Sequence, residues 1–197
     1  RKIVDHVADI NLTYSDIARE YLLREGLPAD RVIKTGSPMF EVLNSRNEDI
    51  EKSDVLERLG LEAEKYFVIS AHREENISSE QNFRDLIDSL NTIAEKYHMP
   101  LIVSTHPRTR KMIEAKGVEF NPLVRTMKPL GFNDYVKLQK FAKAVLSDSG
   151  TINEESSILG FPAITIRQAH ERPEGMDEGT LIMSGLKSED IINSIDI

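Results

Sequence analysis

The sequence predicts an α/β fold built on a doubly wound parallel sheet. Short apolar runs rich in β-branched residues suit strands that are covered on both faces. They occupy residues 66–70, 101–104, 144–147, 163–167 and 180–183. Segments with helical spacing separate most of these runs, and strands that alternate with helices predict a parallel sheet with right-handed crossovers.

The first forty residues form a separate group of elements. Helical spacing begins at the first residues, and a second helix is predicted over residues 15–26. A strand-like segment covers residues 31–36, and a polar stretch follows Pro38. We therefore expect residues 1–44 to be the tail of one lobe with its connection, and residues 45–197 to be a second lobe. A chain that starts in this way, without Met, is expected to be part of a larger protein.

The longest predicted helix lies between the first two strands of the second lobe. Ser78 and Gln81 have the spacing of a capping box, which marks a helix start. An apolar stripe with helical spacing then covers residues 83–97, and Pro100 marks its end. Two shorter helices are predicted farther along, the second closed by a glycine, over residues 133–142 and 152–159.

Composition excludes several classes of function. The formal net charge of −8 argues against nucleic acid as a partner, because such proteins present a basic face to phosphates. There is no cysteine, so disulfides and thiolate chemistry are excluded. No apolar run approaches the ~18 residues of a membrane helix, and the histidines lack the close spacing of a metal site. We therefore expect no membrane and no metal.

Polar segments directly follow four of the predicted strands. Because the carboxyl ends of parallel strands meet at one edge of a sheet, where ligands bind, these segments are expected to converge. They are AHREEN (71–76), THPRT (105–109), DSGT (148–151) and QAHERPEG (168–175). Histidines, arginines and a Ser-Gly-Thr turn at one edge predict a site for an anionic ligand.

The turn from Ser149 to Thr151 precedes a predicted helix and suits an anion cradle. Gly150 permits close approach of the backbone, while the two hydroxyls and the first N–H groups of the helix donate hydrogen bonds. Glu155 suits the first helical turn and can also accept hydrogen bonds from a ribose diol. The alternative is that Ser-Gly simply caps the helix. With Arg172 expected at the same edge, we favour phosphate binding.

Five residues at this edge have two interpretations each. His72 either contacts phosphate or transfers a proton, as an imidazole near neutrality can, or it hydrogen-bonds to its own loop. His106, restrained by the proline that follows it, has the same ambiguity. Arg73 and Arg172 either contact the ligand, with Arg172 forking onto a diphosphate, or are surface charges. Tyr135 either stacks on a base or belongs to the core.

With these residues in place, the sequence resembles the non-hydrolysing UDP-N-acetylglucosamine 2-epimerase family. The segment SDSGTINEESSILGFPAITIRQAHERPEGMDEGT (147–180) carries the main match, and AHREEN, THPRT and RKIVDH support it in the family's order and spacing. The resemblance implies two Rossmann-like lobes, as in GT-B glycosyltransferases, with a UDP-sugar between them. This chain corresponds to the end of the first lobe and most of the second, C-terminal lobe.

The resemblance also implies a reaction. A proton leaves C2 of a UDP-N-acetylhexosamine, UDP is expelled to give a 2-acetamidoglucal, and UDP adds back after C2 is reprotonated on the other face. The acid/base carboxylates of the family precede Arg1, so we expect this chain alone to be inactive. The implied setting is synthesis of capsule or O-antigen polysaccharide precursors in the cytoplasm, by a homodimer that needs no cofactor.

By motif, the resemblance assigns roles to individual residues. His72 is the active-site histidine, and His106 contacts the diphosphate region of the nucleotide. Tyr135 takes the place of an aromatic residue that stacks on uracil. The other residues expected to bind the UDP-sugar are Arg73, Asn76, Ser149, Gly150, Thr151, Glu155 and Arg172.

Two departures from the common family pattern resemble one branch of the family. The common turn is Ser-Gly-Gly, and Thr151 takes the place of its last glycine. Glu74 takes the place of an arginine in the common motif HRREN. Both resemble the branch that makes UDP-N-acetyl-L-fucosamine from its 2-epimer, a 2,6-dideoxy-L-talose derivative. Two other functions stay open. They are the nucleotide lobe of a GT-B glycosyltransferase, which needs an acceptor, and a non-catalytic UDP-sugar-binding module, which binds without turnover.

Overall fold

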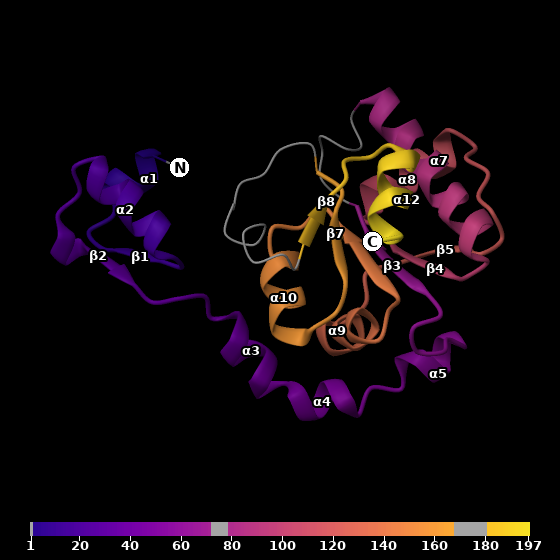
Figure 1. Ribbon diagram of the computed structural model, residues 1–197, viewed down its shortest axis with the longest axis horizontal. Coiled ribbons are helices and arrows are strands. Elements are labelled where there is room, and N and C mark those ends of the chain that lie inside the picture. Colours follow the sequence, from indigo (N-terminus) through magenta and orange to yellow (C-terminus); the bar gives the residue numbers. More distant parts are fainter. Residues whose placement is uncertain (1, 72–78, 168–180) are drawn as a thin grey trace. The chain divides into compact units, whose positions relative to one another are not determined.

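The computed structural model describes residues 2–71, 79–167 and 181–197. The chain divides into two compact units, Arg1–Ser45 and Arg46–Ile197, which we call unit 1 and unit 2. Figure 1 labels their helices and strands. Each unit is described by itself.

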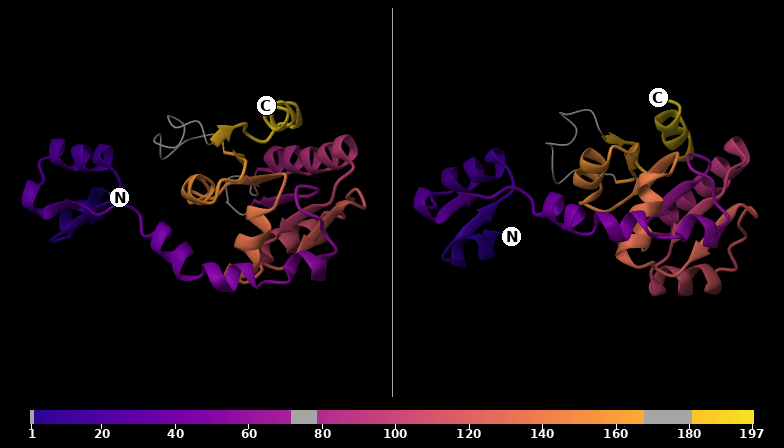
Figure 2. Two further views of the ribbon diagram at one scale, coloured as in Figure 1. Left: turned by 60° about the horizontal axis from the view of Figure 1, so that its bottom comes forward. Right: turned by 90° about the horizontal axis from the view of Figure 1, so that it is seen from below.

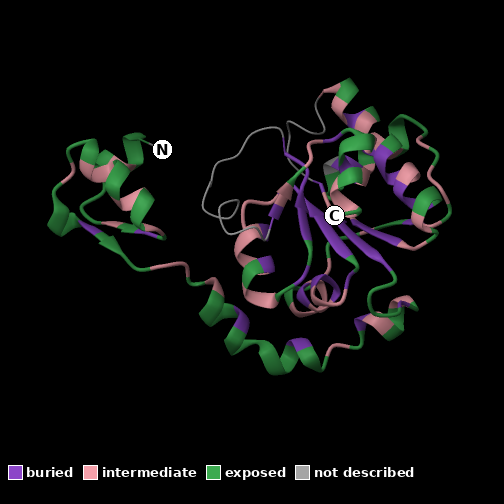
Figure 3. Cartoon of the chain, in the orientation of Figure 1, coloured by how far each residue is buried: buried purple, intermediate pink, exposed green. Residues whose placement is uncertain are grey.

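Unit 1 is a small parallel βαβ arrangement. Its elements are α1 (Lys2–Val7), β1 (Asn11–Thr13), α2 (Asp16–Arg24), the 3-10 helix η1 (Ala29–Arg31), β2 (Val32–Lys34) and α3 (Met39–Ser45). β1 pairs in parallel with β2, and α2 lies between them in sequence. Among the described residues of unit 1, only Thr13, Val32 and Leu43 are buried (Figure 3). A piece of this size has too little apolar surface for a substantial core.

Unit 2 is built around a six-stranded parallel sheet, which confirms the predicted Rossmann-like α/β fold. Its strands are β3 (Phe67–Ser70), β4 (Leu101–Ser104), β5 (Val124–Met127), β6 (Ala144–Ser147), β7 (Ala163–Thr165) and β8 (Leu181–Met183). They follow the order β5-β4-β3-β6-β7-β8, and neighbouring strands are parallel. The chain therefore moves from β3 to one edge and then from β6 to the other. Open α/β sheets bind ligands where the order reverses, which is here between β3 and β6.

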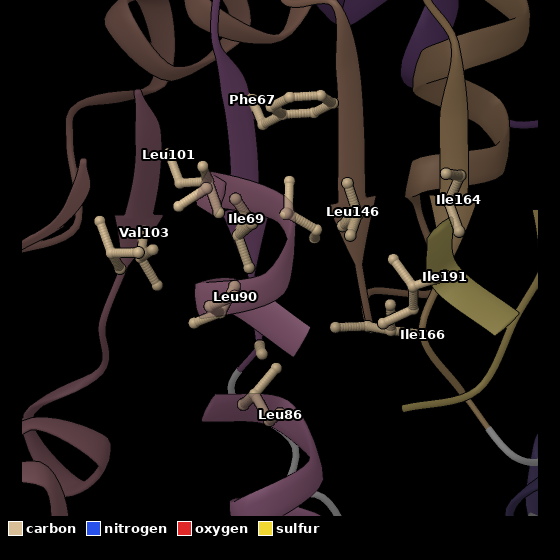
Figure 4. Close-up of a cluster of buried hydrophobic side chains, with 14 of the residues drawn as sticks. Phe67, Ile69, Leu86, Leu90, Leu101, Val103, Leu146, Ile164, Ile166 and Ile191 are labelled. Carbon is tan, nitrogen blue, oxygen red and sulfur yellow. The ribbon is translucent and has the colours of Figure 1, made fainter. Parts of the chain in front are cut away.

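Helices cover both faces of this sheet. The described helices of unit 2 are α4 (Asn47–Glu51), α5 (Val55–Leu59), α7 (Glu80–Tyr97), α8 (Pro107–Ala115), α9 (Phe132–Lys140), α10 (Ile152–Leu159) and α12 (Ser188–Ile195). Side chains of α7 and α12 pack on one face, in the cluster drawn in Figure 4. Side chains of α5, α9 and α10 pack on the other face. Figure 2 shows the helical layers from two further directions.

Residues of β3 illustrate why continuous apolar runs predict these strands. Phe67 and Ile69 belong to the cluster under α7 and α12, whereas Val68 belongs to the cluster under α9 and α10. Successive side chains of a strand point to opposite faces. A strand covered on both faces therefore needs an apolar residue at every position, and the three residues named are at most 1% exposed.

Strand β5 and helix α8 differ from the prediction. β5 was not predicted, because it lies at the edge of the sheet and exposes Arg125 and Thr126, so its sequence is not continuously apolar. THPRT was expected to be a strand-end loop, but α8 begins inside it at Pro107. The polar stretch after Pro38 also contains helices, since α3 and α4 occupy most of it.

The other predicted helices differ from the structure only at their ends. The long helix α7 begins after its N-cap Ser79, whose hydroxyl accepts a hydrogen bond from the Asn82 N–H at 3.3 Å. The residue predicted to start this helix, Ser78, lies outside the described residues. α9 begins one residue before the predicted start and ends two residues before the predicted end. Among the residues that the structure describes, no helix is both long and apolar enough to span a bilayer.

Candidate functional site

The turn between β6 and α10, residues 148–151, lies where the strand order reverses. Backbone hydrogen bonds tie it and β6 to both neighbouring strands. The Asp148 N–H donates to the Ser70 carbonyl at 3.0 Å, and the Ile166 N–H donates to the Ser147 carbonyl at 3.1 Å. Asp148 is fully buried, whereas the three residues that follow it are partly exposed. The strand ends thus hold a turn whose tip is accessible within the described part of the chain.

Two hydroxyl groups organise this turn. Ser149 Oγ lies 2.9 Å from Thr151 Oγ1 and accepts a hydrogen bond from the Thr151 N–H at 3.3 Å. The Ser149 N–H donates to Ser147 Oγ at 3.0 Å. Each hydroxyl carries one proton, and the pair uses one of its two protons for the mutual hydrogen bond. Whichever hydroxyl donates, no described residue takes the proton of the other, which therefore remains for a ligand.

The side chain at the N-cap of α10 does not cap the helix. Thr151 occupies the N-cap position, but its side chain makes no capping hydrogen bond, so it leaves the first N–H groups of the helix without that acceptor. Gly150 has no positive φ, and no atom lies within 4 Å of the position that its Cβ would take. Among the described residues, neither backbone strain nor packing explains a glycine here. A side chain at this position would occupy the open space beside the turn.

Glu155 places a carboxylate in the first turns of α10. Its Oε2 accepts a hydrogen bond from Gln139 Nε2 of α9 at 2.7 Å, and its N–H donates to the Thr151 carbonyl at 3.0 Å. Gln139 is only 1% exposed, while Glu155 is partly exposed. The carboxylate is therefore anchored from the interior through one oxygen.

Tyr135 of α9 lies near Ser70, Asp148 and Glu155. Its partly buried ring packs against the cluster on the α9 and α10 face of the sheet. Burial raises the pKa of the Tyr135 phenol to about 12; a hydrogen bond with Ser70 opposes this rise, and the Glu155 and Asp148 carboxylates add to it. One side of the ring therefore contacts the core cluster, and the hydroxyl lies near the end of β3. Its stacking on uracil stays a prediction, and Phe132, one turn earlier, is 46% exposed.

His106 is exposed and lies directly before α8. It follows β4, the neighbour of β3, and so belongs to the same sheet edge as the turn. Pro107 is the first residue of α8, a favourable place for proline because the missing N–H would have no intrahelical acceptor there. The remaining predicted site residues lie outside the described residues: His72, Arg73, Asn76 and Arg172.

The sequence prediction missed Gln139. Residues three and four apart in a helix are neighbours, so Tyr135, Val136 and Gln139 share one face of α9. Val136 and Gln139 are both buried. A glutamine at the spacing of apolar residues was the available signal for a buried, hydrogen-bonded amide.

Comparison with known proteins decides the family. The family model described as UDP-N-acetylglucosamine 2-epimerase matches residues 1–197. The chain belongs to the UDP-N-acetylglucosamine 2-epimerase family. A curated relative of that name from Methanococcus maripaludis is 29% identical over 203 residues, which cover 100% of this chain and 56% of the relative. The family predicted from the motifs is therefore confirmed.

Solved structures of UDP-N-acetylglucosamine 2-epimerases share the fold. The one from Rickettsia bellii matches with a TM-score of 0.89 and 46% identity, over 100% of this chain and 52% of its own. The Methanocaldococcus jannaschii enzyme, solved in complex with UDP-GlcNAc and UDP, matches with a TM-score of 0.90 and 28% identity, over 100% of this chain and 56% of its own. The chain spans about half the length of the epimerases that it matches.

Proposed function

We propose that unit 2 is the UDP-binding lobe of a UDP-sugar 2-epimerase and that unit 1 is the end of the other lobe with its connection. The observation that carries this proposal is the combination of groups at the start of α10. A hydroxyl pair with a spare proton, a glycine with open space beside it and an anchored carboxylate lie within residues 149–155. The complex of the Methanocaldococcus jannaschii relative with UDP-GlcNAc and UDP supports this class of ligand.

The diphosphate and the ribose of UDP match the hydrogen-bonding groups at the start of α10. The diphosphate accepts hydrogen bonds from the spare hydroxyl proton and from the first N–H groups of α10, where the helix dipole favours an anion. The ribose diol donates to the Glu155 carboxylate. In this proposal His106 and Arg172 contact the diphosphate, and Tyr135 stands at the uracil, as the family resemblance implies.

The proposed reaction inverts C2 of a UDP-N-acetylhexosamine. A base removes the C2 proton, the electron pair of that C–H bond forms the C1–C2 double bond, and UDP leaves with the electron pair of its bond to C1. Reprotonation of C2 on the opposite face and re-addition of UDP to C1 give the 2-epimer. His72 acts in the active site. The acid/base carboxylates are expected outside this sequence, so the 197-residue chain should bind UDP without turnover.

Thr151 and Glu74 favour the branch that interconverts the UDP-activated 2-acetamido-2,6-dideoxy-L-talose and N-acetyl-L-fucosamine. Thr151 supplies the second hydroxyl of the pair in the turn, which the usual glycine lacks. The proposed setting is polysaccharide precursor synthesis by a cytoplasmic homodimer. This substrate carries a 6-deoxy L-sugar, whereas UDP-GlcNAc carries a D-sugar with a 6-hydroxyl, so substrate choice is a direct test.

Two experiments test the proposed function. Isothermal titration calorimetry of the 197-residue chain should show saturable UDP binding. The double substitution Ser149→Ala with Thr151→Ala should weaken it by about tenfold, because it removes the hydroxyl pair and with it a hydrogen bond to a charged ligand. A chain that does not bind UDP would overturn the proposal. NMR of the full-length enzyme in D2O with each candidate UDP-sugar should show deuterium entering at C2. Turnover that needs an acceptor would instead indicate a transferase, and binding without exchange a sensor.

A further inference from the structure

Gln139 is a buried amide that is tied to the proposed site by one hydrogen bond. A buried amide costs free energy unless its polar groups find partners. Within the described residues, Gln139 Oε1 has no hydrogen-bond partner, whereas Nε2 donates to Glu155 Oε2 at 2.7 Å. The burial of this amide is therefore compensated mainly at one carboxylate.

The chemistry of the pair sets the orientation of the amide. An ionised carboxylate only accepts hydrogen bonds, so it pairs with the NH2 end of Gln139 and repels the carbonyl end. Hydrogen bonds of this charge-assisted kind are stronger than neutral ones. Among the described residues, Glu155 is held through Oε2, which leaves Oε1 and the second lone pair of Oε2 for other donors.

We propose that Gln139 is a positioning residue that directs the Glu155 carboxylate toward a ribose diol. This inference rests on the proposed function. A glutamate on a helix surface samples several rotamers, and fixing one of them costs conformational entropy. An anchor that holds the rotamer before the nucleotide arrives removes that cost from binding.

The competing role for the same hydrogen bond is a structural clasp between α9 and α10. Both roles predict a loss of stability when the bond is removed. Only the positioning role predicts that the loss of affinity depends on the ribose hydroxyls of the ligand. The decisive quantity is therefore the ratio of dissociation constants for deoxy-nucleotide and UDP, rather than the affinity for UDP alone.

The experiment measures binding of UDP, 2′-deoxy-UDP and 3′-deoxy-UDP to the 197-residue chain by calorimetry. The wild-type chain should bind at least one deoxy analogue about tenfold more weakly than UDP. Gln139→Met keeps the length of the side chain but cannot donate, and it should reduce that preference to about twofold. Glu155→Gln should remove the preference, and adding Gln139→Met to it should have no further effect, because the two residues act as one unit.

Two further variants keep the test independent of folding. Gln139→Asn retains an amide but is one methylene too short for the bond, so it should reduce the preference like Gln139→Met. Ser89→Ala is the matched control: Ser89 is fully buried in α7 and donates to the Leu186 carbonyl at 2.7 Å. It removes a buried hydrogen bond on the other face of the sheet and should leave the nucleotide preference unchanged.

Each outcome decides between the roles. If Gln139→Met weakens all three nucleotides by the same factor, or none of them, the inference is overturned and the bond is a structural clasp. A wild-type chain that binds UDP and both deoxy analogues equally overturns ribose recognition by Glu155 and the inference with it, while UDP binding stands. A wild-type chain that binds no nucleotide overturns the proposed function itself.

Discussion

Replacing Gly150 with alanine is expected to stabilise the folded chain and to weaken UDP binding, two effects of opposite sign. The residue has no positive φ, and nothing lies within 4 Å of the position of a Cβ. An alanine that fits without strain stabilises a protein by about 0.4–1 kcal/mol, chiefly because it restricts the unfolded chain. In a domain of this size, the melting temperature should rise by roughly 1–4 °C.

The same methyl group occupies the space in which we place the diphosphate. Displacing a phosphate oxygen from one N–H removes a hydrogen bond to a charged group, which is worth about 1.5–3 kcal/mol. The affinity should fall by at least about tenfold. At a UDP concentration about 100 times the dissociation constant, the ligand stabilises the wild-type chain by about 2.7 kcal/mol, and a tenfold loss of affinity reduces this to about 1.4 kcal/mol.

Thermal unfolding with and without UDP measures both effects at once. Gly60→Ala is the matched control, because Gly60 closes α5 with a φ of 61°. Alanine there is strained by about 1–2 kcal/mol and should lower the melting temperature, while the UDP-induced rise stays intact. If Gly150→Ala retains the full UDP-induced rise, the diphosphate does not lie against the turn and the reasoning fails.

Three further predictions concern Asp134, Tyr135 and Ser89. Hydrogen bonds from Ser53 at 2.6 Å and Arg58 at 2.5 Å hold the pKa of the Asp134 carboxyl below its usual value. Its stabilising contribution is therefore present above its ordinary pKa and is lost as the pH falls through the lowered value. Urea unfolding should show Asp134→Asn to be destabilising at about pH 7, by an amount that shrinks as the pH falls below about 4; an effect that does not change with pH would count against this. Burial raises the pKa of Tyr135 to about 12, so its labelled ring carbons should show no ionisation by NMR up to about pH 10, with Tyr135→Phe assigning the signal. Ser89→Ala should lower the free energy of unfolding by about 1–2 kcal/mol, since a buried carbonyl loses its donor, and calorimetry should find UDP binding unchanged.

Agreement between local signals explains which elements the sequence predicted well. β4, β6 and α10 have the predicted bounds, and Gly160 ends α10 with a φ of 73°. Apolar runs covered on both faces and a glycine in the left-handed region are signals that do not depend on distant partners. β5 carries no such signal, because an edge strand has one neighbour and its exposed residues need not be apolar.

The site residues likewise divide into those that local sequence signals predicted and those that depend on tertiary contacts. Ser149, Gly150 and Glu155 were predicted from their place at a helix start, and the structure gives the turn its hydroxyl pair and Glu155 its anchor. Tyr135 was predicted to stack or to be core; the structure shows a partly buried ring packed against the core cluster, and its stacking on uracil stays a prediction. Gln139 carried a weak signal, because its partner is 16 residues away on another helix.

The sequence by itself determined the alternation of strands and helices, the residue types at the strand ends and, through its motifs, the family. These properties depend on periodicity and spacing along the chain, which are local. Only the tertiary structure decided the strand order β5-β4-β3-β6-β7-β8 and the contact between Gln139 and Glu155. The physical reason is that the strand order places α9 and α10 on the same face of the sheet. This packing brings Gln139 and Glu155 into contact, although no local sequence pattern connects them.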